Sequence, residues 1–194
     1  MKKLNWGILG TGWIAHEMGE ALTAVNGEIY AVCNVRLAGA QQYAEEFGVQ
    51  KVYGSPDEMF ADENVDIVYI ATPHNLHYEA MLKALKAGKH VFCEKSITVN
   101  SRQLEECAAL AEEKGLIICD GTTLLHMPLY KKLRQIIEEG AIGYVKMVQV
   151  NFGSCKEYDV NNRFFSKELA GGALLDIGAV SYTHLRAHET AANL

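Results

Sequence analysis

Long apolar runs and an excess of positive charge are both absent from this sequence. No stretch approaches the roughly 18 consecutive apolar residues of a membrane-spanning helix, so we expect no membrane span. The 18 Lys and Arg residues are outnumbered by 24 Asp and Glu, which gives a net charge of −6 and argues against a nucleic acid partner. Two lysines follow Met1, but Asn5 and two glycines interrupt the apolar stretch behind them, unlike the core of a signal peptide. We therefore expect a cytoplasmic protein.

Clustered cysteines are missing as well. The five cysteines are an odd number, widely spaced and without a C-x-x-C pair, which predicts reduced thiols and no zinc site. Near the end of the chain, His184 and His188 have the spacing of two ligands on one helix face, but no third ligand accompanies them. We expect no metal site.

What is present is a regular alternation of strand-like and helix-like segments over residues 1–120. Strands are predicted at 4–9, 28–33, 66–71, 89–93 and 116–120. Helices are predicted at 13–24, 37–47, 75–87 and 100–114, with a further helix start at 55–58. This alternation predicts right-handed crossovers and an α/β fold with a doubly wound parallel sheet.

The pattern changes after Asp120. Residues 128–139 place apolar side chains on one helix face, and residues 144–152 alternate in the way of a half-exposed antiparallel strand. We expect residues 121–179 to be the start of a second, α+β domain.

A glycine-rich turn joins the first predicted strand to the first predicted helix. The sequence GTGWIA at 10–15 has the form G-x-G-x-x-A. Gly10 would permit a tight turn, Gly12 would let a pyrophosphate approach the backbone, and Ala15 would keep helix and strand close. We predict a Rossmann dinucleotide-binding domain with Gly10, Gly12, Trp13, Ile14 and Ala15 at the cofactor; the alternative is a purely structural turn.

The end of the second predicted strand bears on the choice of cofactor. About 20 residues after the glycines, NAD-binding domains carry an acidic residue for the ribose hydroxyl. Here Asn34 and Arg36 occupy that region without a carboxylate. Asn34 can hydrogen-bond a ribose or phosphate oxygen, and Arg36 can neutralise a 2′-phosphate, so we expect NADP rather than NAD. The alternative is that Arg36 is a solvated loop charge.

Polar residues follow two further strands, and ligands bind at the carboxyl ends of such strands. From these two segments we predict cofactor contacts by Ala71, Thr72, Pro73, Asn75, His77, Glu94 and Lys95. A lysine at a strand end beside a carboxylate suits proton transfer to or from a hydroxyl. Alternatively, Asn75 caps a helix, His77 serves packing, and Glu94 and Lys95 form a surface pair.

Four motifs occur in order: GILGTGWIA (7–15), ATPHNLHY (71–78), CEKS (93–96) and AGGALLDIG (170–178). With them, residues 4–179 resemble the Gfo/Idh/MocA oxidoreductases, nearest to the branch of dimeric dihydrodiol dehydrogenases and NADP-dependent xylose dehydrogenases. The resemblance implies a Rossmann domain followed by an open, largely antiparallel sheet. It also implies hydride transfer between nicotinamide C4 and a hydroxyl-bearing carbon of a sugar, polyol or dihydrodiol.

The resemblance assigns roles to individual residues. The family's E-K-P motif matches Glu94-Lys95-Ser96, so Lys95 would share the proton of the substrate hydroxyl near the nicotinamide ribose; Ser96 departs from the usual proline. The family's second catalytic motif is an Asp followed four residues later by His or Tyr. It aligns with Asp176, but Val180 stands in the later position. Asp176 would orient the substrate or pair with Lys95, or else cap a helix.

The remaining expectations concern the second domain. Arg163 is a candidate for the rim of the substrate pocket, and the full-length form is expected to associate with itself through the second domain's sheet. Residues 180–194 have no counterpart in the resemblance, so we expect a non-native tail and a truncated chain. One alternative to the dehydrogenase is a nucleotide-binding chain without turnover. Another is an S-adenosylmethionine methyltransferase, against which the glycine turn and Glu94–Lys95 argue.

Overall fold

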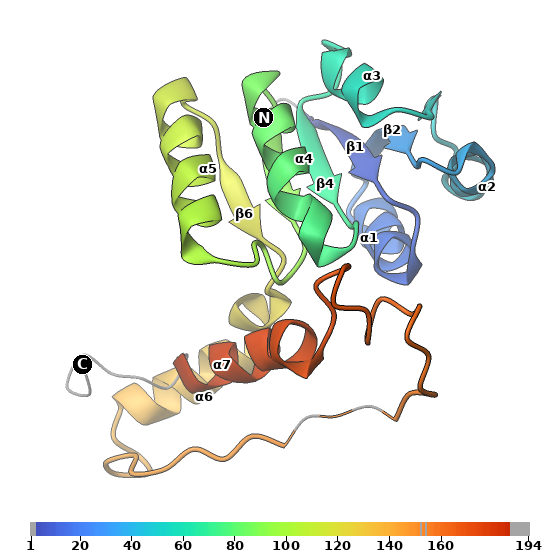
Figure 1. Cartoon of the computed structure of the whole chain (residues 1–194). Helices are drawn as coiled ribbons and strands as arrows, with labels where there is room; N and C mark the ends of the chain where they lie inside the picture. The colour runs from blue at the N-terminus through green and yellow to red at the C-terminus, as the bar shows by residue number, and fades with distance from the viewer. Residues whose placement is uncertain (1–2, 152, 154, 187–194) are drawn as a thin grey trace. The chain divides into compact units, whose positions relative to one another are not determined.

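The computed structural model describes residues 3–151, 153 and 155–186 (Figure 1). Contacts within the chain divide it into two compact units, the first ending at Gly121 and the second beginning at Thr122. None of the described helices is both long enough and apolar enough to cross a membrane. The two units are taken in turn.

The first unit alternates strands and helices along its whole length. Its elements are β1 (Asn5–Leu9), α1 (Trp13–Ala24), β2 (Glu28–Cys33), α2 (Leu37–Phe47), β3 (Lys51–Tyr53), α3 (Pro56–Ala61), β4 (Ile67–Ile70), α4 (His74–Lys86), β5 (His90–Cys93), α5 (Ser101–Lys114) and β6 (Ile118–Asp120). All strand pairs are parallel, in the order β3-β2-β1-β4-β5-β6. This is the doubly wound order of a Rossmann fold, with its switch point between β1 and β4, and it confirms the predicted fold class.

Helices cover both faces of the sheet, and each face has its own core. One core joins α3, α4 and α5 to alternate strand residues such as Val68 and Ile70. The other joins α1 and α2 to the strand residues between them, such as Ile8 and Tyr69. Figure 1 shows α4 and α5 side by side, in agreement with the many contacts between them. Because both faces are buried, the central strands β2 (after Glu28) and β4 are continuously apolar rather than alternating.

The ends of the elements follow local chemistry. The side chain of Asn100 accepts a hydrogen bond from the Gln103 N–H at 3.1 Å and so caps α5, which ends at Gly115 in the left-handed conformation (φ 64°). β3 was not predicted, because its three residues are too few to show a period. It forms by pairing with the end of β2, where Val32 lies opposite Val52.

The second unit is mostly irregular between its helices. It contains a 3-10 turn (Thr123–His126), α6 (Pro128–Glu138), a π-helical segment η2 (Leu174–Gly178) and α7 (Ala179–Arg186). The helix predicted at 128–139 is therefore present. The strand predicted at 144–152 is wrong for its described part, since residues 144–151 form no strand. A strand needs a hydrogen-bonded partner, and no segment among the described residues of this unit pairs with it.

Asp62 joins two strands of the first unit to the residue that precedes a third. Asp62, just after α3, accepts hydrogen bonds from the hydroxyls of Tyr30 in β2 (3.1 Å) and Tyr53 in β3 (2.7 Å). Its backbone carbonyl accepts one from the amine of Lys89, which is buried in front of β5 (2.7 Å). The backbone N–H of Asn64, aided by the tyrosine hydroxyls, lowers the pKa of Asp62 to about 2.

This lowered pKa predicts a specific acid sensitivity. An unfolded aspartate titrates near 3.8, so the stabilisation from the ionised Asp62 is complete above about pH 4 and is lost as the pH falls toward 2. We expect the urea midpoint of the Asp62→Asn variant to lie below that of the parent at pH 5, with the difference shrinking by pH 2.5. The exposed Glu45→Gln substitution serves as control. A difference for Asp62→Asn that does not change between pH 5 and 2.5 would contradict this origin of its stabilisation.

Candidate functional site

The turn between β1 and α1 lies tightly against the end of β4. Gly10 has φ +96°, and a Cβ added to it would lie 2.7 Å from the carbonyl oxygen of Ala71. The Gly10 N–H donates to the Cys33 carbonyl at 2.9 Å, and the Ala71 N–H donates to the Leu9 carbonyl at the same distance. Backbone geometry and close approach both require glycine here, so the turn is fixed between the ends of β2 and β4.

Gly12, by contrast, is not required by the protein's own packing. A Cβ at this position would meet nothing within 4 Å, and its backbone (φ −81°) is open to any residue. It stands before α1, whose start has no side-chain cap and no acidic residue in its first turn. The first N–H groups of a helix attract anions, so this open surface fits the pyrophosphate of a dinucleotide. Trp13 beside it is 73% exposed, Ile14 is half-buried, and Ala15 is fully buried under the helix.

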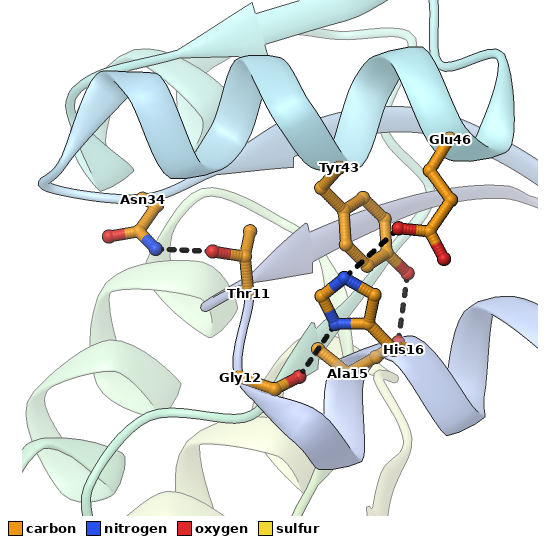
Figure 2. A network of polar contacts seen from close by, with 7 residues as sticks. All are labelled: Thr11, Gly12, Ala15, His16, Asn34, Tyr43 and Glu46. Carbon is orange, nitrogen blue, oxygen red and sulfur yellow. Dashed lines mark hydrogen bonds and ion pairs between the residues drawn. The ribbon is translucent and has the colours of Figure 1, made fainter.

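The end of β2 is tied to the same turn (Figure 2). The side-chain amide of Asn34 donates to the hydroxyl of Thr11, and its oxygen accepts from the Arg36 N–H at 3.0 Å. Asn34 therefore joins the glycine turn to the loop before α2, and Arg36 begins that helix with its side chain exposed. Residues 34–38 contain no carboxylate that would repel the negative charge of a phosphate.

Helix α2 supports the turn from the side, as Figure 2 also shows. The buried hydroxyl of Tyr43 donates to the Ala15 carbonyl at 2.9 Å. The ring of His16 lies between the Gly12 carbonyl (3.0 Å) and the Glu46 carboxylate (3.3 Å). Gly19 permits this contact between helices, because a Cβ there would lie 2.6 Å from the Tyr43 hydroxyl. Sequence reasoning missed these supports, since Tyr43 and His16 look like ordinary helix residues.

The loops after β4 and β5 meet around one buried ring. His77 is fully buried, with Nε2 at 2.8 Å from the Thr72 carbonyl and Nδ1 at 2.9 Å from the Ser96 carbonyl. Direct cofactor contact by His77, as predicted from the sequence, does not fit this placement, because both ring nitrogens face carbonyls inside the protein. The hydroxyl of Thr72 is buried and has no hydrogen-bond partner within the described part of the chain.

Glu94 and Lys95 are not a surface pair. The Glu94 carboxylate accepts a hydrogen bond of 2.6 Å from the buried Tyr69 hydroxyl and one of 3.3 Å from the Lys95 N–H. Burial raises the pKa of Glu94, and burial beside this carboxylate raises that of Tyr69. Lys95 is half-buried, and its peptide bond to Ser96 is cis. Tyr69 was predicted only as an apolar strand residue, and nothing in the sequence indicated its bond to Glu94.

The remaining predicted site residues lie at the start of α4, at the end of β4 and in the second unit. Pro73 precedes α4, and Asn75 lies exposed in the first turn of that helix rather than at its cap. Ala71 is half-buried at the end of β4. In the second unit, Asp176 lies in the first turn of η2, whose N-cap is Ala173, and its N–H donates to the Gly172 carbonyl at 3.1 Å. The exposed Arg163 stacks its guanidinium 4.1 Å from the Phe164 ring centre.

The predicted tail begins within a helix. Residues Val180–Arg186 belong to α7, whereas 187–194, including His188, lie outside the described residues. Among the described residues, no group of three or more His, Cys, Asp or Glu side chains is arranged to hold a metal ion.

Comparison with known families agrees with this geometry. Residues 4–122 match the oxidoreductase family with an NAD-binding Rossmann fold, Gfo/Idh/MocA. Residues 130–185 match a Gfo/Idh/MocA C-terminal domain, and this second match continues past the domain end predicted at residue 179.

Individual relatives point the same way. A trans-1,2-dihydrobenzene-1,2-diol dehydrogenase of Xenopus laevis is 36% identical over 177 residues, covering 90% of this chain and 53% of the relative. The D-xylose 1-dehydrogenase (NADP(+)) of Hypocrea jecorina is 35% identical over 204 residues, covering 93% of this chain and 51% of the relative. The chain thus spans about half the length of the curated relatives it matches.

Solved structures resemble the chain as well. A variant of KijD10, a 3-ketoreductase from Actinomadura kijaniata in complex with TDP-benzene and NADP, superposes with a TM-score of 0.70 at 34% identity. The match covers 74% of this chain and 45% of that one. With the sheet order, the glycine turn and the matched residues in agreement, the chain belongs to the Gfo/Idh/MocA family of oxidoreductases.

Proposed function

We propose that the chain binds NADP(H) along the carboxyl edge of its sheet, and that the whole protein oxidises or reduces a sugar, polyol or dihydrodiol at a hydroxyl-bearing carbon. The observation that carries the proposal is the open surface at Gly12, beside the start of α1 and near the end of β2. Residues 1–120 would hold the cofactor, and 121–179 would contribute to the substrate side. Of the predicted tail at 180–194, residues 180–185 fall within the match to the C-terminal domain.

The strand order supports a placement for each half of the cofactor. In a doubly wound sheet the end of β2 faces the adenosine ribose, so the nicotinamide half falls on the other side of the switch point, at β4 and β5. Gly12, Trp13 and Ile14 would hold the pyrophosphate, and Arg36 the 2′-phosphate. On the nicotinamide side we place the unpartnered Thr72 hydroxyl together with Ala71, Pro73, Asn75, Glu94 and Lys95.

Lys95 is our candidate for the proton step. When bound, the nicotinamide would accept or supply the hydride. The Lys95 amine would take the hydroxyl proton as the alcohol is oxidised and return it in the reverse direction. Asp176 would orient the substrate, and Arg163 would contribute to the rim of its pocket. These substrates are chosen because the relatives are named for diols, xylose and a keto group.

A second candidate function is nucleotide binding without turnover. It is favoured by Val180, which stands where the resemblance places a His or Tyr. A chain of this kind would bind the cofactor as proposed but would not convert it.

Two further proposals concern the protein's setting. We propose a cytoplasmic location, supported by five cysteines that are all free. We also propose that the full-length form associates with itself through the second domain, supported by exposed apolar side chains such as Met147 (81%) and Leu174 (83%).

The two glycines give a matched test of cofactor binding. Gly12→Ala fits the backbone and its own surroundings, although alanine is a poorer N-cap than glycine. We therefore expect the free energy of unfolding to fall by no more than about 1 kcal/mol, while NADPH affinity falls at least about tenfold. Gly10→Ala forces a side chain onto the Ala71 carbonyl and should cost about 2 kcal/mol or more. Urea unfolding and fluorescence titration measure both. Unchanged NADPH affinity in Gly12→Ala would contradict the proposed pyrophosphate site.

Arg36 is expected to set the preference for NADP. A charge-assisted hydrogen bond contributes about 1.5–3 kcal/mol, so Arg36→Ala should raise the Kd for NADPH roughly 10- to 150-fold. The Kd for NADH, which lacks the phosphate, should stay within about twofold. Arg102→Ala, an exposed change on α5, is the control. Equal weakening of both cofactors by Arg36→Ala would show that Arg36 does not read the 2′-phosphate.

Lys95 is tested by turnover. We expect Lys95→Met to lower NADP reduction over a panel of sugars and diols by about 10²–10⁴-fold, as loss of an acid–base group does. NADPH binding should persist, and the exposed Lys86→Met should behave as the parent. Cofactor binding without turnover in the parent itself would favour the second candidate function instead.

A further inference from the structure

Lys95 lies in the loop after β5, two residues past the end of the strand. Its upstream neighbour is nevertheless fixed, because the Glu94 carboxylate is hydrogen-bonded to the Tyr69 hydroxyl of β4 at 2.6 Å. Its downstream neighbour is fixed as well, since the Ser96 carbonyl lies 2.9 Å from Nδ1 of His77. Lys95 is therefore bracketed by two contacts to other elements.

The second of these contacts links two loops at once. Nε2 of the same His77 ring lies 2.8 Å from the carbonyl of Thr72, in the loop after β4. His77 belongs to α4, whose buried residues Met81 and Leu85 anchor the helix in the core. The ring thus connects a rigid helix to both loops at the ends of β4 and β5.

The chemistry of these contacts allows the ring to act only as a donor. Both partners are carbonyl oxygens, which accept hydrogen bonds and cannot donate them. A ring with one N–H donates to only one of the two carbonyls, whereas a ring with an N–H on both nitrogens donates to both. Burial lowers the pKa of His77, and the hydrogen bonds to the two carbonyls act in the opposite direction. A donor placed between two carbonyls is not explained by packing, because an apolar side chain would fill the space without satisfying either oxygen.

We propose that His77 is a positioning residue, which holds the Lys95–Ser96 loop against the Thr72 loop and so sets the nicotinamide half of the site. The expected effect of His77 on ligand binding rests on the proposed cofactor site, whereas its contacts with the two loops are observed within the chain. The glycine turn and Arg36 lie on the other side of the switch point and are held by α2 instead. Loss of His77 should therefore affect one half of the cofactor and spare the other.

Two ligands, one with the nicotinamide and one without it, distinguish a positioning role of His77 from a general loss of protein stability. We expect His77→Ala to weaken NADPH binding about tenfold or more, while adenosine 2′,5′-bisphosphate, which lacks the nicotinamide, binds within about twofold of the parent. Leu85→Ala, a core truncation in the same helix, is the matched control and should weaken both ligands alike or neither. Equal weakening of both ligands by His77→Ala would overturn the proposal, as would no weakening of NADPH.

Conservative variants identify the loop that matters. Asparagine places an amide nitrogen near the position of Nδ1, facing Ser96, whereas glutamine places one near Nε2, facing Thr72. If the lysine loop is what His77 holds, His77→Asn should recover most of the NADPH affinity and His77→Gln should not. Recovery by glutamine alone would overturn the assignment to the lysine loop.

Amide hydrogen exchange tests the contact without any ligand. In His77→Ala we expect peptides covering residues 94–98 to exchange about tenfold faster or more, with residues 10–16 unchanged. Uniform acceleration, or none, would contradict the positioning role. If the parent binds neither ligand while exchange changes as expected, the proposed cofactor site fails and the contact between the loops stands.

Discussion

The site depends on the close approach of the β1–α1 turn to the end of β4, where no side chain fits between Gly10 and the Ala71 carbonyl. This contact lies at the point where the strand order reverses, so the turn can face outward beside α1. Helix α2 supports the turn on one side, and α4 supports the loops of β4 and β5 on the other.

This division gives the site two separately held halves. On the β2 side, Asn34 ties the glycine turn to the loop that presents Arg36. On the β5 side, the buried residues Tyr69 and His77 hold the loop that presents Lys95. In both halves a buried or hydrogen-bonded neighbour fixes the backbone next to the charged residue.

Much of the fold could be predicted because its signals are local. The glycine turn, the Asn100 cap and Gly115 each act through backbone chemistry within a few residues, and the elements around them were placed to within a few residues of their observed bounds. Where structure depends on a partner, prediction failed: β3 arises from pairing with β2, and residues 144–151 form no strand. The sequence motifs identified Gly10, Gly12 and Lys95 as candidate site residues. The hydrogen bonds of Tyr69 to Glu94 and of His77 to Ser96 could not be predicted, because these partners lie 25 and 19 residues apart in the sequence.

A crystal structure of the chain with NADP tests most directly whether one cofactor spans both halves of this edge. We predict the pyrophosphate against the backbone at Gly12, the 2′-phosphate at the Arg36 guanidinium, and the nicotinamide between the Thr72 and Lys95 loops. A dinucleotide bound away from Gly12, or one whose 2′-phosphate and nicotinamide occupy the opposite halves, would contradict the account.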